Sequence, residues 1–167
     1  MDDGTTLGLQ ANGMTIANNL RMTGGHDPVI DTGANNSTWA GAISGAGILS
    51  KQGSGTLTLS SLANNYTGAT QIAQGVLQAG AVNAFSSTSA HNVAAGATLD
   101  LAGYNQTLSS LNNSGMVSLS SHAGATPGTV LKLTGPYVGN GGTLGISTVL
   151  AADGSASDKL LLSGPNA

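Results

Sequence analysis

The stretch Gly53-Ser-Gly-Thr-Leu-Thr-Leu59 decides the fold of this chain. Its glycines permit the tight bend and close backbone approach that a corner between two strands requires. Its alternation places Leu57 and Leu59 on one face of a strand and the threonines on the other, as in a half-buried strand. The stretch therefore predicts a short strand that begins at a glycine corner.

The same unit, a glycine followed by alternating apolar residues, recurs along the chain at positions 4, 55, 96, 115, 128 and 142. Through the middle of the chain, glycines 55, 75, 96 and 115 lie about 20 residues apart, a period typical of solenoids. Strands of three to five residues between Asn and Gly corners suit coils that stack about 4.8 Å apart. We expect an all-β fold, a right-handed parallel β-helix (solenoid) of roughly seven coils.

The spacing changes after residue 114. The glycine units at 115, 128 and 142 are only about 13 or 14 residues apart, too close for full coils, and such spacing favours hairpins. We expect residues 1–114 to form the coils and residues 115–167 to form a C-terminal β-sandwich-like cap. The apolar density of this part, which includes Val149, Leu150 and Leu162, predicts that it is the most stable unit. The residues expected in the core of the coils and the cap are Leu57, Leu59, Leu99, Leu101, Tyr137, Leu144, Ile146, Leu160 and Leu161.

The composition excludes several classes of function. Charged residues make up 7% of the chain, against roughly 25% in a typical soluble domain. The net charge is −3 and the four basic residues are scattered singly, whereas nucleic-acid binding needs a clustered basic face. The absence of cysteine excludes disulfides and Cys-type zinc sites. No signal peptide opens the chain, and we expect it to be a fragment of a longer protein.

No arrangement of reactive residues indicates catalysis. His26, His91 and His122 lie in Gly-, Ser- and Ala-rich surroundings without metal-ligand spacing, which favours surface loops over a catalytic role. The carboxylates of Asp153 and Asp158 favour a polar turn over a calcium site, which needs six or more oxygen ligands. We expect no catalytic, cofactor-binding or metal-ligating residue, no cofactor and no small-molecule substrate.

The aromatic residues allow two interpretations, exposed rings that bind sugars or rings packed inside or across the coils. We favour packing, the commoner use of such rings. The residues concerned are Trp39, Tyr66, Phe85, Tyr104 and Tyr137.

Two parts of the chain resemble bacterial autotransporter passengers. Residues 41–47, 49–59, 64–70 and 75–78 follow the order of the β-strand repeat of that family, including its Leu-x-Lys-x-Gly-x-Gly-Thr-Leu-Thr-Leu segment. Residues 137–146 and 150–164 resemble the pertactin-like autochaperone region, which caps a passenger β-helix. The family resemblance implies type V secretion and export through the outer membrane to the bacterial cell surface. From the residues of the chain we expect no enzymatic activity.

The resemblance also implies a role in folding. The chain would be an autochaperone and stalk-base segment that nucleates folding of the β-helix from its C-terminal end during translocation. Its partners would be the rest of its own passenger and its translocator barrel. One alternative is an adhesin or host-protein-binding module, for example part of an actin-recruiting virulence factor that contacts a host surface or cytoskeletal protein. A β-helix enzyme acting on polysaccharides is less favoured, because pectin-cleaving β-helices need clustered Asp, Arg and Lys residues and Asp100 stands alone on its strand.

Overall fold

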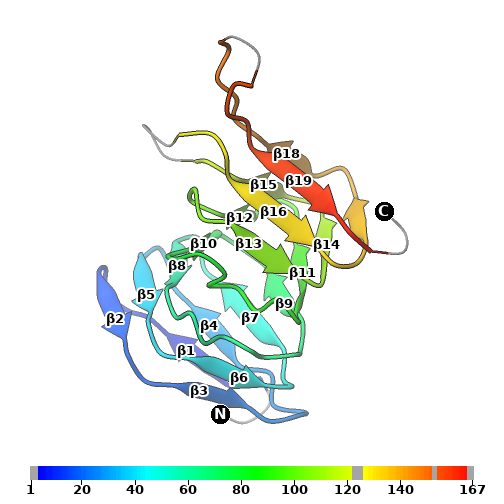
Figure 1. The fold of residues 1–167 in the computed structure, drawn as a ribbon. Coiled ribbons are helices and arrows are strands. Elements are labelled where there is room, and N and C mark those ends of the chain that lie inside the picture. The colour runs from blue at the N-terminus through cyan, green and yellow to red at the C-terminus, as the bar shows by residue number, and fades with distance from the viewer. Residues whose placement is uncertain (1–3, 122–125, 152–153, 165–167) are drawn as a thin grey trace.

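The structure, a computed structural model, describes residues 4–121, 126–151 and 154–164. Its strands are three or four residues long and follow one another around the three sides of a β-solenoid (Figure 1). The first sheet contains β1 (Thr6–Gly8), β4 (Val29–Asp31), β7 (Leu49–Gln52), β9 (Thr70–Ile72), β11 (Ala90–Val93), β14 (Ser110–Asn113) and β17 (Tyr137–Gly139). The second contains β2 (Met14–Ile16), β5 (Ser37–Trp39), β8 (Thr56–Leu59), β10 (Val76–Ala79), β12 (Thr98–Asp100), β15 (Met116–Ser118) and β18 (Thr143–Gly145).

The third side is built from two separate sheets. One pairs β3 (Leu20–Met22) with β6 (Ile43–Gly45), and the other contains β13 (Gln106–Leu108), β16 (Val130–Leu133) and β19 (Lys159–Leu162). The part of the chain that the structure describes contains no helix long and apolar enough to cross a membrane. The expected all-β parallel solenoid is thus confirmed, and its right-handedness stays a prediction.

The alternation read from the sequence sets which side chains enter the coil. In the second sheet Leu57 pairs with Leu77, Leu77 with Leu99, and Leu99 with Val117, so these side chains form one buried column. Thr58, between Leu57 and Leu59, faces outward and is half-buried. The core is therefore a stack of aliphatic columns along the solenoid axis.

Glycine is required where one coil approaches the next. A Cβ atom at Gly55 would collide with the backbone carbonyl oxygen of Asn35 in the preceding coil. Gly45 has a φ of 102°, a conformation that L side chains rarely adopt, and a Cβ there would collide with the carbonyl oxygen of Met22. The sequence prediction that glycines mark close corners is confirmed at these positions.

The expected β-sandwich-like cap is wrong for the described residues. β17, β18 and β19 pair in parallel with β14, β15 and β16, so they continue the same three sides instead of forming hairpins. The antiparallel contact described in this region is one bridge between Thr148 and Ser157. The short glycine spacing misled because consecutive strands of one coil, such as β15 and β16, each begin just after one of these glycines.

Side-chain amides join the coils where the third side is interrupted between β6 and β13. The Asn64 side chain accepts a hydrogen bond from the Ile43 amide and donates one to the carbonyl of Ala84, both at 2.7 Å. The Gln106 side chain accepts from the Phe85 amide at 3.1 Å and donates to the carbonyl of Ala81 at 2.7 Å. These two amides therefore replace backbone ladder bonds between neighbouring coils.

Candidate functional site in the C-terminal coils

The carboxylate of Asp158 ties together three segments of the C-terminal coils. Its Oδ1 accepts hydrogen bonds from the backbone amides of Gly128 and Thr129, at 2.9 Å each, and from Ser120 Oγ at 3.0 Å. Its Oδ2 accepts one from the Ser147 amide at 2.9 Å. Asp158 is only 3% exposed, directly before β19. We call this group of five residues the Asp158 clamp.

The Asp158 clamp holds an ionised carboxylate. Burial alone would raise the pKa of the Asp158 carboxyl, but hydrogen bonds from Gly128, Ser147, Thr129 and Ser120 together outweigh burial and lower it. Both carboxylate oxygens accept hydrogen bonds from N–H or O–H groups. This arrangement stabilises the coils and is not that of a cation ligand. The predicted polar turn missed this role, because the donors lie 11 to 38 residues away in sequence. Asp153, its expected neighbour, lies outside the described residues.

We expect Asp158→Asn to lower the free energy of unfolding by about 2–4 kcal/mol, because it removes charge-assisted hydrogen bonds and turns an NH₂ group toward a donor. Urea unfolding at pH 7 measures this loss. The folded-state pKa is lowered, so the contribution of Asp158 is full above its unfolded pKa and is lost as the pH falls through the folded pKa. Asp27→Asn, which affects a carboxylate with one described hydrogen bond, to the Ile48 amide, is the control and should cost under about 1 kcal/mol. Equal losses in the two variants would contradict the clamp.

The structure places the expected core residues unevenly. Leu57, Leu59, Leu99 and Leu101 are fully buried, and Tyr137, Leu144 and Leu160 are partly buried against the core.

Two expected core residues lie at the surface. Ile146 and Leu161 are 59% and 46% exposed, so their expected place in the core is wrong. Leu161 is paired with the exposed Lys132, and Ile146 follows β18 in the last coil. Val149, Leu150 and Leu162, which contribute to the apolar density of this part, are exposed as well.

A buried polar network fills the interior beside β9 and β11. The Tyr66 hydroxyl lies 2.9 Å from Thr70 Oγ1, which lies 2.9 Å from Ser89 Oγ, and Ser89 Oγ donates to the carbonyl of Gly68 at 2.8 Å. Burial, the largest cause, raises the pKa of Tyr66 to about 12 despite hydrogen bonds that lower it. Buried hydroxyls that satisfy one another in this way fix the register of neighbouring coils.

His91 belongs to this interior, and its expected place in a surface loop is wrong. It is fully buried on β11, paired with the inward Thr70 and Leu111, and its Nδ1 lies 3.1 Å from the carbonyl oxygen of Ser89. Its ring lies 5.7 Å from that of Phe85. The alternation of Ala90-His-Asn-Val93 is the signal that predicts this inward position.

The other two histidines lie elsewhere. His26 is half-buried in a turn with its Nδ1 3.0 Å from Thr23 Oγ1, and His122 lies outside the described residues. Among the aromatic residues, Trp39, Tyr66 and Phe85 are buried as predicted, whereas Tyr104 is 40% exposed.

We expect His91 to make the fold sensitive to mild acid. Burial lowers its pKa from 6.5 to about 4, outweighing the Ser89 hydrogen bond that raises it. Because the unfolded chain binds the proton first, stability falls as the pH drops from about 6.5 toward 4, by about 2 kcal/mol between pH 7 and pH 5. Urea melts at both pH values measure this, with His91→Gln as the variant that should lose the dependence. An unchanged dependence in that variant would show that another group is responsible.

Lys51 is a buried cation for which no structural role was predicted from the sequence. Its Nζ donates to the backbone carbonyls of Gln52, Gly53 and Gln74, at 2.8, 2.9 and 3.2 Å. Burial lowers the pKa of Lys51 to about 8, against the opposing effect of Asp31. The ammonium group thereby links the corner after β7 to the following coil, which contains Gln74.

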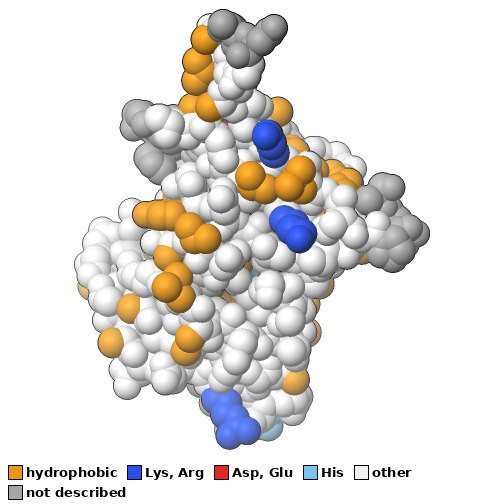
Figure 2. Space-filling view, viewed as in Figure 1, with side chains coloured by type: hydrophobic (Ala, Val, Ile, Leu, Met, Phe, Trp, Pro, Cys, Tyr) orange, Lys and Arg blue, Asp and Glu red, His pale blue; other side chains and the backbone are white. Residues whose placement is uncertain are grey.

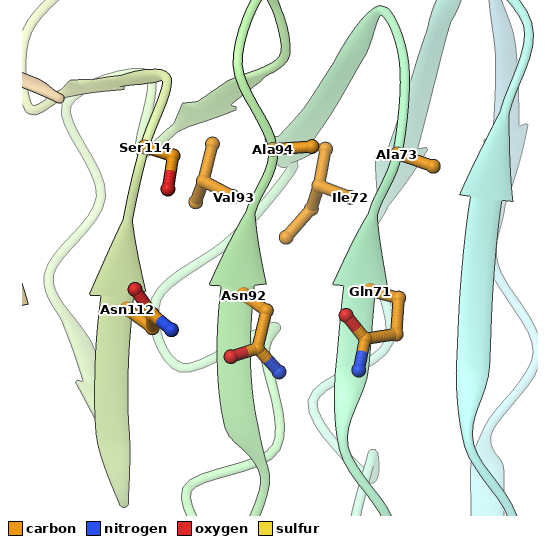
Figure 3. A pocket seen from close by; sticks show the side chains of 8 residues that line it. All are labelled: Gln71, Ile72, Ala73, Asn92, Val93, Ala94, Asn112 and Ser114. Carbon is orange, nitrogen blue, oxygen red and sulfur yellow. The ribbon is translucent and has the colours of Figure 1, made fainter. Parts of the chain in front are cut away.

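The three hollows described on the surface carry no acid–base pair. One hollow of about 250 Å³ lies over β9, β11 and β14, where the amides of Gln71, Asn92 and Asn112 stand in a row (Figure 3). None of the three hollows that we describe is lined by Asp, Glu or His. Within the described residues, no three His, Asp or Glu side chains gather as metal ligands. None of these three hollows favours the polysaccharide-cleaving alternative.

Comparison with known proteins gives two family matches. Residues 49–79 match the passenger-associated-transport-repeat, and residues 106–167 match the autochaperone domain type 1. The first match contains the Lys51 corner and part of the buried network, and the second contains the Asp158 clamp. No solved structure matches the chain.

Two curated proteins are similar over most of the chain. The uncharacterized protein YuaQ of Escherichia coli (strain K12) is 39% identical over 124 residues, covering 73% of this chain and 9% of that protein. The adhesin BmaC autotransporter of Brucella suis biovar 1 (strain 1330) is 37% identical over 113 residues, covering 66% of this chain and 3% of that protein. The chain thus spans less than a tenth of either relative. With the repeat at residues 49–79 and the autochaperone domain at residues 106–167, the chain belongs to the passenger region of an autotransporter.

Proposed function

We propose that the C-terminal coils fold first and serve as the template on which the preceding coils fold, while the chain is exported through the outer membrane to the cell surface. The Asp158 clamp carries this proposal. It links residues 120, 128, 129 and 147 to the residue directly before β19 by hydrogen bonds. All of these residues lie within residues 106–167, so the hydrogen bonds can form before any other coil is present.

The exposed strand edges of a solenoid explain how one folded coil promotes the next. Before the preceding coils form, β15, β16 and β17 present unpaired N–H and C=O groups, which later pair with β12, β13 and β14. Each arriving coil then gains a full set of ladder bonds without a new nucleation step. We propose that the coils are right-handed, that the division between residues 1–114 and 115–167 separates templated coils from template, and that the translocator barrel of the same protein is the partner during export.

The order of folding can be tested with two matched core substitutions. Leu131 on β16 and Leu49 on β7 are both fully buried, and replacing either with Ala should cost about 2–5 kcal/mol. If the C-terminal coils form first, Leu131→Ala slows refolding, whereas Leu49→Ala mainly speeds unfolding. Stopped-flow refolding and unfolding in urea measure both rates. A refolding rate reduced more by Leu49→Ala than by Leu131→Ala would overturn the proposal.

A second candidate function is adhesion. The observation that favours it is the name of the Brucella suis relative, an adhesin, although the chain covers only 3% of that protein. Under this candidate the coil sides would contribute to binding a host-surface or cytoskeletal protein. Deleting the chain from its parent passenger, with the remaining passenger still folded, should then reduce attachment of bacteria to host cells.

A further inference from the structure

The exposed basic side chains lie on one side of the solenoid, the third side. Arg21, Lys132 and Lys159 are exposed on the strands of the third side, which Figure 2 shows from the front. The third side comprises β3, β6, β13, β16, β19 and the connecting residues 60–67 and 80–88. These described residues include no Asp or Glu. Asp158, directly before β19, is 3% exposed and faces its donors. A chain with a net charge of −3 therefore presents a cationic third side.

Apolar side chains are exposed along the same side. Leu62, Val82 and Tyr104 are 74%, 48% and 40% exposed. They occupy the connections that follow β8, β10 and β12, and a 2.9 Å backbone hydrogen bond from Asn83 to Asn105 sets Val82 beside Tyr104. Figure 2 shows hydrophobic side chains gathered along this side.

A groove lies beside these apolar side chains, where the third side lacks strands. Its volume is about 300 Å³, and it is lined by Leu62, Asn64, Asn83, Phe85, Ser87 and Thr107. We call it the third-side groove. Thr107 is the direct register partner of Lys132, so a cation stands one coil away from the groove wall.

We propose that the third-side groove binds an extended acidic peptide segment that also carries apolar side chains. Lys132, one coil from the groove wall, complements a carboxylate, and Leu62 and Tyr104 offer apolar contacts. The side chains of Asn83, Ser87 and Thr107 provide hydrogen-bonding groups for a peptide backbone. A concave groove with one cation a coil away fits a peptide better than a flat anionic membrane. This binding is independent of the folding role proposed above.

Fluorescence anisotropy with the folded 167-residue chain tests the proposal. The probe is a labelled decapeptide of alternating Glu and Leu, compared with one in which Lys replaces Glu and one in which Ser replaces Leu. We expect the Glu–Leu peptide alone to bind, and the affinity to fall at high salt. Tyr104→Ser and Leu62→Ser should each weaken binding about tenfold, and Lys132→Gln should weaken it and reduce the salt dependence.

Met116→Ser is the matched control, because Met116 is 40% exposed, like Tyr104, but lies on β15 of the second sheet. It should leave binding unchanged, and circular dichroism should show every variant folded. Absence of binding, equal binding of the Lys–Leu peptide, or an equal loss in Met116→Ser overturns the proposal. Binding of phosphatidylglycerol vesicles in place of the peptide, lost in the same variants, also overturns it in favour of an anionic membrane. Refolding rates should stay unchanged in these variants. Unchanged rates would show that the loss of peptide binding does not arise from the folding role proposed above.

Discussion

A chain that ends at Ser114 will fail to form a stable β-sheet, whereas a chain that begins at Gly53 will keep its sheet signal. The two fragments are nearly equal in length, 114 and 115 residues, so size does not distinguish them. Each deletion opens one end of the solenoid and leaves aliphatic columns uncovered there. Only the second fragment keeps the Asp158 clamp and the whole autochaperone match, residues 106–167. We therefore expect the difference to arise from the C-terminal coils.

Far-ultraviolet circular dichroism and urea unfolding of the two fragments measure this result. Amide hydrogen exchange of the full chain is the control, because it needs no truncation. Protection should be high in the coils around β13 to β16 and low toward β1 to β3, where no preceding coil covers the edge in this chain. A cooperative unfolding transition in the fragment ending at Ser114, or protection that is highest in residues 4–50, would falsify the template role.

Leu57→Ala should reduce the free energy of unfolding by about 2–5 kcal/mol. Leu57 is fully buried in the column between Ser37 and Leu77, and removal of its side chain leaves a cavity that the rigid coils above and below cannot fill. Midpoints and slopes of urea melts, taken at constant pH, measure the loss.

Thr58→Ala is the control at the neighbouring position of the same strand. The Thr58 hydroxyl donates a hydrogen bond to Gln78 Oε1 at 3.1 Å on the outer face, and its loss should cost under about 1 kcal/mol. Midpoint shifts of equal size in the two variants would mean that the alternation does not separate the inside of the coil from the outside.

Particular local patterns in the sequence predict the solenoid. Leu57 and Leu59 enter the core because side chains alternate along any strand, and Gly55 marks a close approach because no other residue lacks a Cβ atom. His91 obeys the same alternation, but its Ser- and Ala-rich surroundings favour a loop. The error comes from giving the composition of the surroundings more weight than the position in the strand.

The C-terminal part was harder to predict because its strands resemble hairpin strands locally. β17 and β18 are short, begin near glycines and lie close together in sequence, as hairpin strands also do. Parallel pairing with β14 and β15 depends on contacts about 26 residues apart, which no local pattern encodes. The donors of Asp158, 11 to 38 residues away, are likewise not encoded by a local pattern.

The sequence by itself determined the coil, because alternation and glycine spacing act through the local geometry of each strand. It also determined the passenger resemblance, which the comparisons confirm. Only the tertiary structure decided how coils are joined, through the amides of Asn64 and Gln106, the Lys51 ammonium and the Asp158 carboxylate. The reason is physical: a polar side chain takes its partners from whichever coil lies next to it, and stacking sets that neighbour across 20 or more residues.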